Sequence, residues 1–277
     1  MDMDVTLLSA GLGSVVGLIL ALTGAGGGIL AVPLLVFGLH LSIMQAAPVG
    51  LIAVGAASAF GAVLGLREGV VRYRAAAVIG FTGMALAPVG VRLASVIPNA
   101  PLTVAFSAVL ALVAVRMFKQ ARRIPTGQTE SIQEQSRLPC VLNPAEGRLI
   151  WTMPCAWALA GTGAVSGLLS GLLGVGGGFV IVPSLNRFTN LQMRSIFATS
   201  LAVISLVSVG GVAAAAWQGS IAWNIAAPFA AGAIVALLLG RLIAARLAGA
   251  RLQQAFAVTS GAVSLLLFVR GMGWLTL

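Results

Sequence analysis

Long apolar runs, separated by short polar or glycine-rich stretches, occupy most of the chain. Many of these runs reach the roughly 20 residues that an α-helix needs to cross a lipid bilayer. The pattern predicts two matching series of helices. In each series a first helix meets a glycine-rich break, a short helical piece follows, and three full helices come next. The predicted ranges are about 5–22, 29–39, 43–66, 74–96 and 101–120, then 150–172, 179–188, 191–216, 222–246 and 252–271.

The glycine-rich break is written twice in the chain, 150 positions apart. Residues 24–28 read Gly-Ala-Gly-Gly-Gly, residues 174–178 read Gly-Val-Gly-Gly-Gly, and a proline follows at position 33 or 183. Equivalent residues keep this register over about a hundred positions, which indicates a duplicated unit. We therefore predict a membrane repeat at residues 1–118, a polar linker at 119–148 and a second membrane repeat at 149–277.

The composition is typical of a polytopic membrane protein, since 59% of the residues are hydrophobic and only 8% are charged. We expect an all-α fold in the cell (inner) membrane, with the lipid bilayer as a partner. The net charge of +10 would also suit nucleic acid, but the basic residues lie at the ends of apolar segments, which indicates membrane topology instead. Cys140 and Cys155 match no metal-ligand spacing and are expected to be free thiols.

The basic residues distinguish two topologies. If the first segment of each repeat crosses once, the halves are parallel and several arginines of the second half face outward. These are Arg187, Arg194, Arg241, Arg246 and Arg251. If each first segment enters and returns, the second half is inverted, and these arginines join the linker on the inner side. Arg270 moves outward, so that only it and Arg92 then lie outside. The positive-inside rule favours this second arrangement.

The predicted fold is therefore two inverted repeats, each a Gly-broken helix or re-entrant hairpin plus three transmembrane helices. The linker is expected in the cytoplasm and both termini outside. Inverted repeats with broken helices are common in secondary transporters, which bind their substrates near the middle of the bilayer.

The two breaks form the predicted binding site. Irregular backbone at membrane depth is tolerated only where it is buried in protein or lines a wet cavity. If the breaks face each other, the helical pieces after them point N–H groups and positive dipole ends at one centre, which suits an anion. Because a residue before proline favours extended geometry, it stays open whether each helical piece begins at the break or only at Pro33 and Pro183.

The candidate substrate-binding residues come from both breaks, the two prolines and one later hydroxyl pair. They are Gly24, Gly26, Gly27, Gly28, Pro33, Gly174, Gly176, Gly177, Gly178, Pro183, Thr199 and Ser200. Further polar candidates near the breaks are Thr23, Ser166, Ser170, Asn186 and Ser208. Serine and threonine in helices usually bond their own backbone, so each of these is a weaker candidate than the glycines.

The chain lacks the residues that other chemistries need. No Asp or Glu falls inside a predicted span, which argues against a cation carrier or a carboxylate proton relay. With His40 as the single histidine, we predict no metal site, no cofactor and no enzyme activity. Arg92 and Arg241 lie near helix ends, where snorkelling to the interface is the expected role. It stays open whether His40, Arg92 or Arg241 acts in the pathway.

The paired motif Gly-x-Gly-Gly-Gly-x-x-x-Val-Pro, which begins at Gly24 and at Gly174, resembles that of the TauE/SafE family, the sulfite exporter-like permeases. The segment Ala198-Thr199-Ser200-Leu201 is similar to an Ala-Thr-Ser-Leu segment of that family, whereas the first half has Val49-Gly50-Leu51 instead. The resemblance covers essentially the whole chain. It implies transport of sulfite, thiosulfate or an organosulfonate, while the residues alone indicate only a small anion.

We therefore predict a secondary transporter of a small oxyanion that works by alternating access. Two alternatives remain. A passive anion channel would use the same breaks, and a membrane assembly partner would bind no anion at all.

Overall fold

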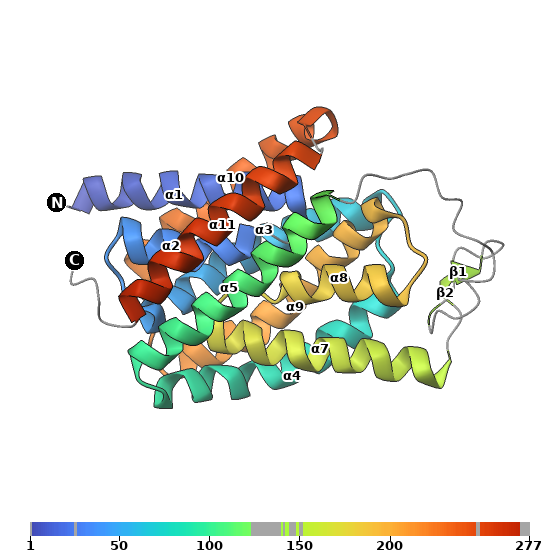
Figure 1. Ribbon diagram of the computed structural model, residues 1–277, viewed down its shortest axis with the longest axis horizontal. Helices are drawn as coiled ribbons and strands as arrows, with labels where there is room; N and C mark the ends of the chain where they lie inside the picture. Colours follow the sequence, from blue (N-terminus) through green and yellow to red (C-terminus); the bar gives the residue numbers. More distant parts are fainter. Residues whose placement is uncertain are drawn as a thin grey trace.

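The structure is a helical bundle with one short β-ribbon (Figure 1). It is a computed structural model that describes residues 2–24, 27–122, 140, 142–143, 148–149, 152–247 and 250–271. The first half contains α1 (Asp2–Thr23), α2 (Gly27–Gly38), α3 (Ile43–Arg67), α4 (Tyr73–Val96) and α5 (Asn99–Arg122). The ribbon pairs β1 (Leu142–Asn143) antiparallel with β2 (Arg148–Leu149). The second half contains α7 (Met153–Leu173), α8 (Gly178–Phe188), α9 (Met193–Trp217), α10 (Trp223–Leu247) and α11 (Ala250–Gly271).

The helices of the two halves follow the repeat found in the sequence. Helix α3 begins at Ile43 and α9 at Met193, while α4 begins at Tyr73 and α10 at Trp223. Both pairs of starting residues are 150 positions apart. The start of α3 has a local cause, because Ser42 and Gln45 form a capping box there. The predicted helices therefore exist, with boundaries shifted by a few residues.

Seven described helices are long and apolar enough to cross a membrane. They are Met3–Thr23, Ile43–Arg67, Tyr73–Val96, Asn99–Arg116, Met153–Leu173, Met193–Trp217 and Trp223–Leu242. The eighth predicted span corresponds to α11, where Ser260–Val269 forms a shorter apolar segment. Helix α2, with 12 residues, and α8, with 11, are about half as long as the others. The chain is therefore an all-α polytopic membrane protein, as its composition predicts.

The largest helix contacts join one half of the chain to the other. Helix α1 packs on α10, α4 on α7 and α9, α5 on α11, and α3 on α9. Glycines make two of these contacts close: a Cβ at Gly17 of α1 would collide with the carbonyl oxygen of Ala233, and one at Gly167 of α7 with that of Gly83. Small residues let helix backbones approach in lipid. The halves interlock rather than forming two separate bodies.

The bundle has two ends, which Figure 1 shows at the right and the left. The end that carries β1 and β2 is called the linker end here, and the other, where α1 starts and α11 finishes, the opposite end. The α3–α4 connection meets the start of α9 at the linker end. A hydrogen bond joins them, in which Ser195 Oγ donates to the Val70 carbonyl oxygen at 2.6 Å. Helix α1 starts at the opposite end, whereas α7 starts at the linker end (Figure 1).

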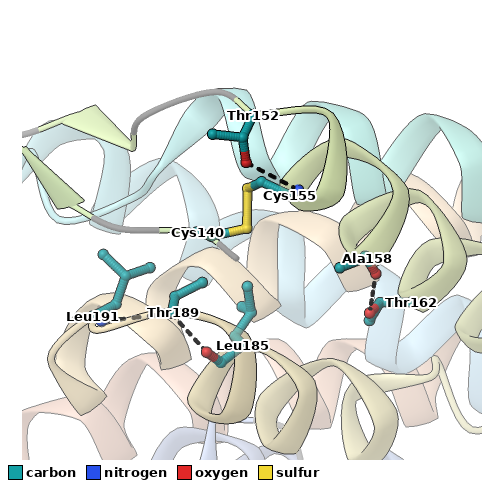
Figure 2. Close-up of a disulfide and its surroundings, with 8 residues drawn as sticks. All are labelled: Cys140, Thr152, Cys155, Ala158, Thr162, Leu185, Thr189 and Leu191. Atoms are coloured by element: carbon teal, nitrogen blue, oxygen red, sulfur yellow. Dashed lines mark hydrogen bonds between the residues drawn. A yellow bond between two sulfur atoms is a disulfide. The ribbon is translucent and has the colours of Figure 1, made fainter. Parts of the chain in front are cut away.

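A disulfide between Cys140 and Cys155 fastens the linker to the bundle (Figure 2). Cys140 also bonds the Phe188 carbonyl oxygen through its backbone N–H at 3.1 Å, and it bridges to Thr189 after α8. The expectation of free thiols is wrong. The sequence places Cys140 in a polar segment and Cys155 in a helix, and only the return of the chain beside α8 brings them together. Residues 123–139 of the predicted linker lie outside the described residues.

Candidate functional site

Each glycine-rich break begins where a long helix ends on a left-handed glycine. Helix α1 is followed by Gly24 at φ +71°, whose N–H donates to the Leu20 carbonyl oxygen, and α7 by Gly174 at φ +72°, which donates to the Ser170 carbonyl oxygen. This is the usual glycine C-cap of a helix. Gly176 and Gly177 also have positive φ, so the second break requires glycine at three positions. Gly26 of the first break lies outside the described residues.

The two breaks lie side by side inside the bundle. A Cβ at Gly28 would collide with the carbonyl oxygen of Val175, and a Cβ at Gly176 would lie 3.1 Å from Val54 and 3.0 Å from Ile204. Val54 and Ile204 are themselves 150 positions apart, so equivalent residues of both halves flank the same point. The described residues of both breaks are buried. The expectation that residues 24–28 and 174–178 lie close together is therefore confirmed for the described part of the breaks.

The short helices begin at the breaks, not at the prolines. Helix α2 starts at Gly27 and α8 at Gly178, and Pro33 and Pro183 lie inside them. Helix therefore forms through both prolines in spite of the extended bias of the residue before each of them and of the one backbone hydrogen bond that each proline removes. Both prolines sit more than one turn from the breaks, so they shape the helices. A direct contact between either proline and an anion stays a prediction.

The break geometry gives the centre a positive character. The first N–H groups of a helix have no acceptor within the helix, and the N-terminus carries about half a positive charge from the macrodipole. Helices α2 and α8 both start at this centre, at Gly27 and Gly178, so two such N-termini converge. That arrangement favours an anion.

Three buried serines of α3, α7 and α9 have hydroxyls without a hydrogen-bond partner among the described residues: Ser58, Ser170 and Ser208. Ser58 and Ser208 are 0% and 2% exposed, and the two positions are 150 apart. The hydroxyl of Ser208 would lie 3.0 Å from a Cβ at Gly55, so it sits at the crossing of α3 and α9. A buried hydroxyl without a partner is costly, and a bound anion or water would satisfy it.

Sequence reasoning singled out Ser170 and Ser208 but missed Ser58 as a candidate. The signal was present, because Ser58 is the repeat equivalent of Ser208. Ser166, another candidate, has a partner in the break itself, since its hydroxyl donates to the Gly177 carbonyl oxygen at 3.2 Å.

Thr199 and Ser200, the predicted hydroxyl pair on α9, have different hydrogen-bond partners. The Ser200 hydroxyl has two carbonyl oxygens within hydrogen-bond distance for its single proton, that of Gly24 at 3.1 Å and that of Phe197 at 2.8 Å. The Thr199 hydroxyl accepts the backbone N–H of Arg72 at 3.0 Å, at the start of α4. The structure therefore brings Ser200 to the first break and directs Thr199 away from it. Contact of either hydroxyl with substrate stays a prediction.

A cavity of about 750 Å³ opens at the linker end and reaches the first break. Its walls include Gly24, Glu68, Arg194, Leu201 and Arg241. At the opposite end, some repeat equivalents of this lining enclose about 50 Å³, among them Ala47, Leu51, Gly171, Leu172, Gln218 and Ser220. Other equivalents, Pro88, Arg92 and Ala214, line a second cavity of about 440 Å³ at this end. The equivalent lining thus forms one wide cavity at the linker end and is divided between smaller cavities at the opposite end.

The remaining residues of open role lie at the ends of the bundle. His40 is exposed in the α2–α3 connection with φ 53°, and Arg92 is exposed beside Trp217 at the opposite end. Arg241 differs from the expectation of simple snorkelling, because its guanidinium bonds the Gly61 carbonyl oxygen and Glu68.

Comparison with known proteins identifies the family of this chain. The model of the family described as "Sulfite exporter TauE/SafE" matches residues 9–267. The chain belongs to the TauE/SafE sulfite exporter family. Two relatives of this TauE/SafE protein, from Xylella fastidiosa strains 9a5c and Temecula1 / ATCC 700964, are each 26% identical over 256 residues. In both cases the match covers 91% of this chain and 89% of the relative, which is named "Probable membrane transporter protein". No solved structure matches the chain significantly.

Proposed function

We propose that this protein is a secondary transporter of a small sulfur oxyanion, such as sulfite, thiosulfate or an organosulfonate. The anion would be held between the two helix breaks, near the middle of the bilayer. The observation that carries the proposal is the convergence of two buried helix N-termini at the breaks, together with the Ser58 and Ser208 hydroxyls on α3 and α9, which are buried and have no partner among the described residues. Membership of a family named for sulfite export supports sulfur as the central atom, and the names of the relatives support transport.

Alternating access is supported by the unequal cavities. In a transporter built from inverted repeats, the two halves exchange conformations, which opens one side while the other closes. The wide cavity at the linker end and the smaller ones at the opposite end are lined by equivalent residues, which fits such an exchange. The opposite starting ends of α1 and α7 (Figure 1) support the inverted arrangement.

Flux measurements test this function against its alternatives. Purified protein in liposomes is expected to take up labelled sulfite or thiosulfate with saturation and with counterflow from a preloaded interior. A passive channel would give neither, and an assembly partner would give no flux. The same anions are expected to raise the melting temperature of the purified protein, and the absence of flux and stabilisation with every anion of this class would refute the proposal.

We also propose that the linker end faces the cytoplasm. The described arginines Arg67, Arg72, Arg74, Arg187 and Arg194 flank the connections at this end, and positive charge marks the cytoplasmic side. The Cys140–Cys155 disulfide argues for the other orientation, because such bonds persist mainly in oxidising compartments. The charge pattern has more weight, since it extends through both halves of the chain and acts when the helices insert.

Single-cysteine labelling in intact cells distinguishes the two orientations. In a background in which both native cysteines are serine, Gln218→Cys at the exposed opposite end is expected to react with a membrane-impermeant maleimide. Gln192→Cys at the exposed linker end is expected to react only after the membrane is opened. The reverse pattern would place the linker end outside, where the disulfide would persist.

A further inference from the structure

Three charged side chains converge at the mouth of the linker-end cavity. Glu68 accepts a hydrogen bond from Arg194 at one carboxylate oxygen, with Nη2 to Oε2 at 3.0 Å, and from Arg241 at the other, with Nη2 to Oε1 at 2.9 Å. The three residues come from the end of α3, the start of α9 and the last turns of α10. One carboxylate therefore bridges two guanidinium groups across the opening.

Arg241 is held in this position by the bundle itself. Its Nη1 donates to the Gly61 carbonyl oxygen at 2.9 Å, and its side chain is only 24% exposed. Arginine binds oxyanions well because its planar group offers several donors in a fixed geometry. With one nitrogen anchored on α3, the other is directed toward the cavity mouth, where Glu68 now occupies it.

We propose that Arg194 and Arg241 form a docking site for a small oxyanion, and that the Glu68 carboxylate occupies this site until an incoming anion displaces it. The inference rests on the proposed function. A sulfite or sulfonate group presents oxygens to two donors much as the Glu68 carboxylate does, and hydrogen bonds between charged partners are strong ones. Partly exposed ion pairs contribute little net stability, so the exchange costs the fold little.

The position of this cluster connects it to the central site. Gly24 of the first break lines the same cavity as Glu68, Arg194 and Arg241. The Ser200 hydroxyl lies within hydrogen-bond distance of the Gly24 carbonyl oxygen. An anion released from the arginines would therefore enter a space that leads to the break.

The cluster occurs at only one end of the repeat. The residues equivalent to Arg194, Glu68 and Arg241 are Met44, Gln218 and Val91, and none of them is charged. All three line the small cavity of about 50 Å³ at the opposite end. Charge-assisted docking by this cluster is thus a property of the linker side, whereas the larger opening at the opposite end has Arg92, the equivalent of Leu242, in its wall.

The test compares two kinds of substitution, loss of the carboxylate and loss of an arginine, because a merely structural ion pair would give both the same effect. For purified full-length protein, the sulfite or methanesulfonate concentration that gives half the maximal thermal shift is measured. Glu68→Gln is expected to lower this concentration, because it removes the competing carboxylate. Arg241→Gln and Arg194→Gln are expected to raise it by about tenfold, as loss of a charge-assisted hydrogen bond to the anion requires. Arg187→Gln, which removes an exposed charge at the same end outside the cavity, is the matched control and should change little.

The sign of the Glu68 effect decides the outcome. If Glu68→Gln and the arginine variants all weaken anion binding, or if none of them changes it, the docking site is refuted while anion binding by the wild-type protein still supports the proposed function. If the wild-type protein responds to neither anion, the proposed function itself fails and the docking site with it. Arg194 is largely exposed, so Arg194→Gln tests the idea even if Arg241→Gln does not fold.

Discussion

Replacing Gly176 with alanine is expected to abolish anion-dependent stabilisation and to lower transport at least tenfold. The new Cβ would lie 3.0 Å from Ile204 of α9 and 3.1 Å from Val54 of α3, the two residues that flank the second break. It would occupy the space next to the N-terminus of α8 that an anion needs. A left-handed conformation also costs an alanine about 1–2 kcal/mol, so the melting temperature should fall as well.

A second glycine variant distinguishes the cost of the left-handed backbone from blocking of the anion site by the new Cβ. Gly219 has φ +65°, close to the +74° of Gly176, but a Cβ there meets no atom within 4 Å. Gly219→Ala should therefore lose a similar amount of stability and keep its response to sulfite. If both variants bind and transport equally well, the central break is not the anion site.

Replacing Ser58 and Ser208 with alanine is expected to separate binding from stability. A hydrogen bond to a charged partner contributes about 1.5–3 kcal/mol, so each substitution should weaken the apparent anion affinity by roughly 10- to 100-fold. The unliganded protein should be unchanged or slightly more stable, because the substitution removes a buried hydroxyl that has no partner among the described residues. Affinity is measured from thermal-shift titrations, and stability from the melting temperature without anion.

Ser260 in α11 gives the matched control for these serines. Its hydroxyl is also buried and without a partner among the described residues, but it lies in a helix that packs mainly on α5. Ser260→Ala should have the same small effect on stability and no effect on affinity. A loss of affinity at Ser260 equal to that at Ser58 would mean that the hydroxyls of Ser58 and Ser208 have no special role.

Much of the fold could be predicted because its main signals are local or periodic. Apolar runs fix the helices, the doubled glycine motif fixes the repeat, and both act through neighbouring residues. The start of α2 at Gly27 was harder to predict. The residue before a proline favours extended backbone, which suggested a start at Pro33, whereas the helix in fact runs through the proline. The repeat, correctly read, also predicts that the two breaks are neighbours.

The missed features all depend on contacts between distant segments. Cys140 and Cys155 pair only because the linker returns to α8, and no spacing rule reveals this. Arg241 looked like an interface residue until α3 supplied Gly61 and Glu68 as partners. The difference between the cavities at the two ends is not a property of the sequence at all, since the same chain must adopt both states if it transports.

The interlocking of the halves has a consequence for how the protein is made. Helix α1 finds its main partner in α10, and α4 finds one of its partners in α7, both of which are synthesised only after the linker. When the first half enters the bilayer, the glycine faces of α1, including Gly13 and Gly17, therefore have lipid as their only neighbour. Insertion and packing are separated in time, and the long helices α1 and α4 must remain stable in the bilayer without their partners from the second half until the chain is nearly complete.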